Sequence, residues 1–362
     1  MNRNQIFETS QQFLLANDIP GWLIHDYRNS NPIFQQVLPP LGHVTRPTLL
    51  YIPRQGKPKL LVHHVDAGKF SYQDTVTTDK PELDLVIYQS RDTMVESLRR
   101  ILNGASSVAM EYSPNNDLPR VSRVDAGTVE LVRSLDSEVV SSADLMQFAT
   151  QRWSAEQLSG HKRAAYKLGV IVNQAFRLIG TQLQSSQNSN NTPSEFSIAE
   201  YIRQRFSEEK LTSADGPIVS INSHCSDPHY EPTAENTSIF KSGDWVLIDL
   251  WAKESSAHSV YADITWVAYI GYEIPRQYSE VFETVIKARD SALEFLVNEF
   301  KQGTVNRGWQ ADKVARDFIH SKGYGKFFTH RLGHSISYEV HGEAVNLDDF
   351  ETHDNRSIIP GI

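Results

Sequence analysis

Two strand-like segments that each carry an aspartate constrain this chain more than any other feature. They are Trp245–Trp251 and Tyr261–Val267, with Asp249 and Asp263 near their middles. The aspartates are symmetric about position 256, so a hairpin that turns there places them opposite each other on one side of a sheet. Opposed like charges destabilise a sheet, and a carboxylate in an apolar strand loses its hydration. A divalent cation held by both would offset these costs, so the pattern favours a metal site over an aspartate that points to solvent.

Histidines further along the chain strengthen the metal interpretation. His330, His334 and His341 lie within one short stretch, and His229 precedes the first aspartate segment. A single histidine is more often structural than a ligand. Three histidines so close together indicate a site, since imidazole is a common metal ligand.

Length, charge and cysteine content bound the class of protein. The chain has 362 residues, enough for about two domains, and 40% are hydrophobic, which excludes a disordered chain. Lys and Arg number 35 against 44 Asp and Glu, a net charge of −9 that gives no general affinity for nucleic acid or an anionic membrane. The single cysteine, Cys225, cannot form an internal disulfide. The N-terminus has no secretory pattern and no apolar run approaches the ~20 residues of a membrane helix, so we expect a cytoplasmic protein.

The first 150 residues alternate between strand-like and helix-like segments, which is an α/β pattern. We find no metal-ligand cluster, phosphate loop or nucleophile motif there, so this domain reads as a scaffold or a gate. The expected strands contain Trp22–Ile24, Leu49–Ile52, Leu60–Val62 and Leu85–Tyr88, and the expected helix is Asp92–Leu102.

A second domain, 151–362, begins where capping signals appear. Ser154 followed by Gln157 predicts a helix to about Leu183, and Thr192–Glu195, with Pro193 at the first helical position, predicts another to about Lys210. A polar loop, 185–191, separates them. We then expect strands at 217–221, 245–251 and 261–270, helices at 276–302 and 309–322, and extended chain over the last 40 residues.

Five elements of this second domain fall in the order of a known family. They are Gly216–Val219, Pro228–Tyr230, Asp249, Asp263–Thr265 and Gly333–His341. On these residues the chain resembles the pita-bread metallopeptidases, the group of Xaa-Pro aminopeptidase, prolidase and creatinase. The resemblance implies an α+β architecture, with a creatinase-like α/β domain over 1–150 followed by a pita-bread catalytic domain over 151–362. The Pro-His-Tyr element and the large N-terminal domain favour the Xaa-Pro branch over methionine aminopeptidases.

The resemblance also assigns roles to individual side chains. It implies that Asp249 holds one metal ion through both oxygens, that Asp263 bridges two ions, and that His334 binds the second. His229 and His341 become catalytic and substrate-binding residues, which bind the scissile carbonyl or stabilise the tetrahedral intermediate. His330 would lie either behind the metal ligands or against the prolyl side of the substrate. The implied cofactors are two divalent ions, with Mn²⁺ expected and Co²⁺, Zn²⁺ or Fe²⁺ as alternatives.

The activity implied by the resemblance is hydrolysis at Xaa-Pro bonds of small peptides, of the aminopeptidase P or prolidase type. A hydroxide shared by the two ions attacks the carbonyl, and the ions stabilise the oxyanion. Members of the family often assemble, so a homodimer is expected. Two alternatives stay open: creatinase-like C–N hydrolysis of a small molecule, and a pita-bread module that binds a protein without catalysis. The three ligands in place argue against a metal-free creatinase type.

The chain departs from the family at its end. The family's two glutamate ligands follow the motif that ends here at Pro360–Ile362, so they and their strands are absent from the sequence. We therefore expect a truncated form of a longer protein, with weak metal binding and no activity as written. Trp251 and Trp266 also add bulk where the family has Gly or Arg. Packing is the preferred interpretation for Trp266, and the residues alone do not decide the role of Trp251.

Overall fold

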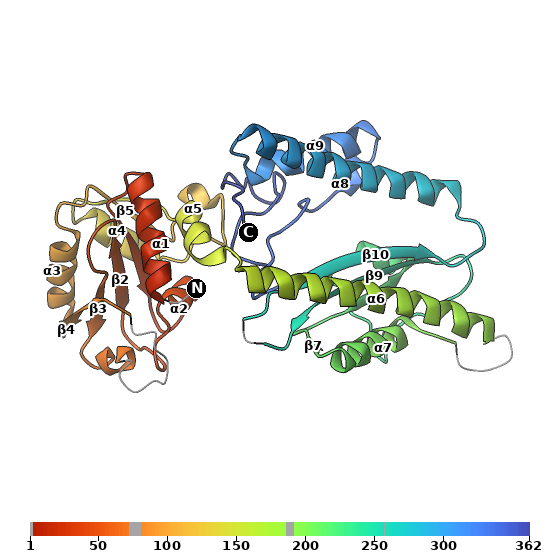
Figure 1. Cartoon of the computed structure of the whole chain (residues 1–362), viewed down its shortest axis with the longest axis horizontal. Helices are drawn as coiled ribbons and strands as arrows, with labels where there is room; N and C mark the ends of the chain where they lie inside the picture. Colours follow the sequence, from red (N-terminus) through yellow and green to blue (C-terminus); the bar gives the residue numbers. More distant parts are fainter. Residues whose placement is uncertain (1–2, 72–80, 186–191, 257) are drawn as a thin grey trace.

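The fold is described from a computed structural model, which covers residues 3–71, 81–185, 192–256 and 258–362. Figure 1 shows an N-terminal α/β unit and a larger unit in which helices lie on a second sheet. The first sheet has the order β4-β3-β2-β1-β5-β6. Its strands are β1 Gly21–Asp26, β2 Thr48–Pro53, β3 Lys59–His63, β4 Asp84–Tyr88, β5 Ser107–Met110 and β6 Glu138–Ser141, and its main helices are α1 Arg3–Ala16, α2 Pro32–Val37, α3 Arg91–Leu102 and α4 Ala126–Arg133. All four predicted strands and the predicted helix are present.

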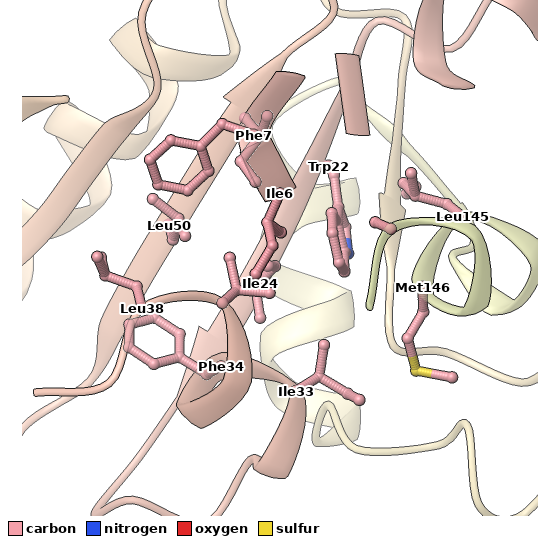
Figure 2. Close-up of a cluster of buried hydrophobic side chains, with 14 of the residues drawn as sticks. Ile6, Phe7, Trp22, Ile24, Ile33, Phe34, Leu38, Leu50, Leu145 and Met146 are labelled. Carbon is pink, nitrogen blue, oxygen red and sulfur yellow. The ribbon is translucent and has the colours of Figure 1, made fainter. Parts of the chain in front are cut away.

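The central strands of this sheet are buried on both faces, because successive residues point to opposite sides and helices cover each side. Trp22 and Ile24 pack with α1, α2 and the short α5 (Ala143–Met146) on one face, as Figure 2 shows. Leu23, between them, packs with α3 and α4 on the other face. All six residues of β1 are therefore buried, a pattern typical of a central strand covered on both sides.

The larger unit places the two aspartates on a hairpin. Its sheet has the order β10-β9-β7, with β8 also pairing with β9. The α6 side of β9 carries Val246, Ile248 and Leu250, which are buried against residues of α6 and α7, and the opposite side carries Asp249. The elements are α6 Ala155–Ser185, α7 Glu195–Glu208, β7 Leu211–Thr212, β8 Ile218–Ile221, β9 Trp245–Glu254, β10 Ala262–Tyr269, α8 Arg276–Gln302 and α9 Gly308–Ser321, with short turns η6 Asn222–Ser226 and η7 Gly325–Phe327.

Two sequence expectations need correction here. The helix expected to begin at Pro193 begins at Glu195, because Ser194 is the N-cap and exchanges side-chain to backbone hydrogen bonds with Ser197. After η7 the described chain makes isolated bridges, such as Gly333 with Leu347, and no regular strand. The polar loop expected at 185–191 lies outside the described residues except for Ser185. Among the described helices, none is long and apolar enough to cross a membrane.

The N-terminal unit contacts the last part of the chain through polar side chains. Gln147 donates to the carbonyl of Ser357 at 2.7 Å and accepts from the Val345 N–H at 3.0 Å. Arg120 and Arg123 bind the carboxylate of Glu343 at 3.0 and 3.3 Å. These contacts hold the segment that carries His341 against the N-terminal unit.

The helix α8 presents apolar side chains to the outside. Its residues Ala288 and Ala292 are buried within the cluster that joins α8 to α9, whereas other apolar residues on the helix are exposed. Such a stripe on a surface favours association. The exposed members are Val281, Phe282, Val285, Leu293, Val297 and Phe300.

Replacing Leu293 by lysine is expected to raise the solubility limit about twofold or more and to lower binding of a hydrophobic dye, since this side chain is 60% exposed. The thermal unfolding midpoint should stay unchanged. Ala292→Lys is the matched control, because Ala292 is 3% exposed and lysine there should destabilise the fold. Unchanged dye binding by Leu293→Lys would contradict the expectation that the exposed apolar side chains of α8 bind the dye and favour association.

Candidate metal centre

The β9–β10 hairpin brings the two aspartates onto one face of the sheet. Asp249 pairs with Thr265, and Asp263 pairs with Trp251. The aspartates are therefore diagonal neighbours and not directly opposed, so the predicted symmetry about position 256 is wrong. The ladder is centred on position 257, which lies outside the described residues. A shift of the centre by one residue moves each pairing by two, which keeps both carboxylates on the same face.

Asp249 behaves as a carboxylate that lacks a positive partner. Burial, followed by the negative charge of Asp263, raises the pKa of Asp249 to about 6. The Thr265 hydroxyl donates to Asp249 Oδ1 at 2.8 Å and opposes part of that rise. A cation between the two aspartates would offset both the burial of Asp249 and its repulsion by Asp263. The same argument led from the sequence to a metal site.

His334 lies beside Asp263 in an orientation that suits a metal ligand. Its Nδ1 is 3.0 Å from the carbonyl oxygen of Ser335, and a carbonyl can only accept, so Nδ1 carries the proton. In the neutral ring Nε2 then bears a lone pair, and Nε2 is 3.5 Å from Asp263 Oδ2. A lone pair facing a carboxylate is repulsive unless a proton or a shared cation joins the two atoms.

His341 completes the group of side chains near Asp263. Its ring centroid is 4.3 Å from that of His334, with the planes at 55°. Burial first, and then the nearby charges of His334, Arg331 and Arg120, lower the pKa of His341, so its imidazole is favoured in the neutral form. The Arg120 guanidinium also donates to the carbonyl of His341 at 3.0 Å. Sequence reasoning missed Arg120, because its position 221 residues away carries no motif.

The structure does not bring His229 and His330 to the aspartates through any described contact. His229 is exposed, and its backbone N–H donates to Asp227 Oδ1 at 2.9 Å. His330 is also exposed, with Nδ1 2.7 Å from the carbonyl of Arg331. Their predicted substrate roles stay predictions.

The types of ligand atom suit a divalent ion, but the side chains that carry them are not close together. Carboxylate oxygens with one imidazole suit Mn²⁺ and similar ions. Within the described ranges, however, no group of three or more His, Cys, Asp or Glu side chains is close enough together to hold an ion. Asp249, Asp263 and His334 therefore supply a partial ligand set in which the acceptors still lie apart.

Trp251 packs against neighbouring backbone, whereas Trp266 is 45% exposed. The Trp251 ring covers Gly216, where a Cβ would lie 2.6 Å from the ring, and its indole N–H donates to Asp215 at 3.0 Å. Gly216 also has a φ of +74°, so glycine is favoured there for two reasons. Trp266 pairs with Ile248 and thus lies on the α6 side of the sheet, away from the aspartates.

The α+β fold and the neighbouring carboxylate and imidazole side chains fit the class of metal-dependent hydrolases. The sequence profile described as "Metallopeptidase family M24" matches residues 162–361, and the chain belongs to this family. This confirms the family expected from the motifs.

The relatives and solved structures agree with this assignment. The Xaa-Pro dipeptidase of Pyrococcus horikoshii is 36% identical over 99 residues, which is 27% of this chain and 25% of that protein. The curated relatives that come first are matched over only 25–39% of their own length. Dipeptidase PepE from Mycobacterium ulcerans has a TM-score of 0.65 at 17% identity, covering 99% of this chain and 86% of that one. An X-prolyl aminopeptidase from Caenorhabditis elegans, described as a cytosolic enzyme with a di-nuclear active site, has a TM-score of 0.61 at 13% identity, covering 100% and 55%. At these identities the two structures show the fold alone, which is the predicted pita-bread architecture.

Proposed function

We propose that the activity of this protein is hydrolysis of peptide bonds at Xaa-Pro sites of small peptides, of the aminopeptidase P or prolidase type, with two divalent metal ions. We expect turnover by the chain as given to be low, because Asp249, Asp263 and His334 form only part of a ligand set. The observation that carries the proposal is the placement of Asp249 and Asp263 on one sheet face, with His334 Nε2 3.5 Å from Asp263. The similar Xaa-Pro dipeptidase and X-prolyl aminopeptidase support the choice of substrate.

Each side chain of the site has a separate role in this proposed reaction. Asp249, Asp263 and His334 would hold the ions, which activate water and neutralise charge on the attacked carbonyl oxygen. The lowered pKa of His341 favours the neutral imidazole, which has one donor and one acceptor nitrogen. His341 is therefore proposed to form a hydrogen bond with the substrate, beside His334. Arg120 holds the His341 backbone and so fixes the position of that ring relative to the N-terminal unit. His229 is proposed to act at the scissile carbonyl, as His341 does, and His330 is proposed to lie on the prolyl side.

Several finer properties belong to the same proposal. We propose domains at 1–150 and 151–362, Mn²⁺ as the metal, a homodimer, and a cytoplasmic location. Because the described ligands are few and lie apart, we expect binding of Mn²⁺ to be weak, and the assay must supply the metal in excess.

The test measures Mn²⁺ binding by calorimetry and hydrolysis of Ala-Pro and of longer Ala-Pro peptides with Mn²⁺ added. Asp263→Asn is expected to weaken Mn²⁺ binding at least tenfold and to lower kcat/KM roughly 100-fold, because it removes one of the negative charges that would hold the ions. Asp290→Asn, an exposed carboxylate on α8 paired with Arg289, should change neither.

Each other outcome has a defined meaning. Binding of Mn²⁺ without hydrolysis would support the metal centre and overturn catalysis by this chain. Hydrolysis of creatine but of no peptide would favour the creatinase-like alternative. If the chain neither binds Mn²⁺ nor hydrolyses peptides, the proposal fails and a non-catalytic binding module becomes the better interpretation.

A further inference from the structure

One fully buried glutamate lies outside the proposed metal centre. Its carboxylate accepts hydrogen bonds from residues of a single segment of the chain. Glu195 is the first residue of α7 and is 0% exposed. Its two oxygens accept four hydrogen bonds, and all four donors belong to the segment 221–238. The donors are the Ile221 N–H at 2.8 Å, the Ser238 N–H at 2.7 Å, His224 Nδ1 at 2.9 Å and the Tyr230 hydroxyl at 2.6 Å.

These four bonds hold the segment at both ends and in its middle. Ile221 is the last residue of β8, and Ser238 directly precedes the bridge between Ser194 and Ile239. The N–H of Glu195 in turn donates to the carbonyl of Ser238 at 3.0 Å. A loop whose ends meet at one group has a fixed shape, since opening it would leave a buried carboxylate with unpaired oxygens.

The anchored segment carries His229 and begins at Ile221, which pairs with Val246, three residues before Asp249 on β9. Ile218 of β8 pairs directly with Asp249 of β9, so the segment leaves the strand that borders the metal aspartate. Tyr230 is 7% exposed, its ring stacks on His224 at 4.3 Å, and its hydroxyl is fixed by Glu195. Because Tyr230 is held inward, its neighbour His229 is left exposed on the outside of the segment.

We propose that Glu195 is a positioning residue that fixes the orientation of His229 toward substrate, acting through Tyr230 and His224. This inference rests on the proposed function, since it needs His229 to contact the substrate. It assigns the buried carboxylate a role in the reaction beyond the stability of α7.

Glu195→Gln is the variant that tests the role with the least change in shape. An amide keeps one acceptor oxygen but turns the other position into an N–H₂ donor that faces donors of the segment. We expect faster amide hydrogen exchange confined to 222–238 and a fall of about tenfold in kcat/KM for Ala-Pro with Mn²⁺. Tyr230→Phe removes only the hydroxyl, which donates to Glu195 at 2.6 Å and to the Asn236 carbonyl at 3.5 Å. It should give the same pattern at about threefold, so the role can still be tested if Glu195→Gln folds poorly. Glu208→Gln, at the exposed end of the same helix, is the control and should alter neither measurement.

A double variant separates positioning from general stability. If Glu195 acts through His229, then Glu195→Gln combined with His229→Ala should be no less active than His229→Ala alone. Multiplicative losses in activity would overturn the proposal. So would exchange that is unchanged at 222–238, or that rises throughout the larger unit. If the wild-type chain hydrolyses no peptide, the proposed function fails on its own, and the exchange pattern still decides whether Glu195 holds the segment.

Discussion

Replacing Arg356 by methionine is expected to lower the free energy of unfolding by about 3–5 kcal/mol. Arg356 and Asp354 have side chains that are 2% and 0% exposed, and they form a two-point ion pair at 2.9 and 2.6 Å. Methionine fills similar space but leaves the Asp354 carboxylate buried without a positive partner. It also removes the bond from Arg356 Nη1 to the carbonyl of Glu343, at 2.7 Å.

Urea unfolding followed by circular dichroism measures this effect, and two variants control it. Arg100→Met breaks an exposed pair with Glu96, whose side chains are 70% and 61% exposed, and should cost at most about 0.5 kcal/mol. Adding Asp354→Asn to Arg356→Met removes the unpaired charge but keeps an acceptor for the Asn346 N–H, so it should recover about 1 kcal/mol or more. A loss below about 1 kcal/mol for Arg356→Met would show that the ion pair is unimportant for folding.

The elements that the sequence predicts well are those with a strong local signal. The helix 276–302 is observed with the predicted bounds, because Gly303 ends it in the left-handed conformation at φ +74°. The aspartate strands are present because alternating apolar residues bury one side of β9. The sequence misplaces the start of α7 because two nearby residues, Thr192 and Ser194, are both good N-caps. The hydrogen bonds exchanged between Ser194 and Ser197 make Ser194 the cap.

The parts of the candidate site that the sequence misses depend on distant contacts. The two aspartates lie on one hairpin, so the sequence correctly predicts that they share a face of the sheet. It does not predict the strand register, which makes them diagonal neighbours. Arg120 reaches His341 from the N-terminal unit, and the four donors around Glu195 converge from a loop with no periodicity. Neither contact leaves a pattern in the local sequence, because each is created by the packing of separate segments.

Glu111 is expected to make stability depend on pH between about 5 and 8. This residue follows β5, is 0% exposed, and accepts hydrogen bonds from Trp22 at 2.6 Å, Ser142 at 3.1 Å and Asn31 at 3.2 Å. Burial raises its pKa from an ordinary 4.5 to about 7, and the hydrogen bonds oppose that rise only in part. The folded protein therefore keeps a proton on Glu111 in a pH range where the unfolded chain has released it.

The sign of the effect follows from proton linkage. A carboxyl with a raised folded pKa stabilises the fold below pH 4.5, and this contribution is lost as pH rises to about 7. The shift corresponds to about 3 kcal/mol. Glu111→Gln cannot ionise, so its free energy of unfolding, measured with urea at pH 5 and at pH 8, should gain about 2.5 kcal/mol relative to wild type between the two values. Glu138→Gln, whose side chain is 63% exposed on the neighbouring strand, should follow the wild-type profile. Parallel profiles for Glu111→Gln and wild type would mean that Glu111 is ionised in the folded protein at pH 5, and that its three donors outweigh its burial.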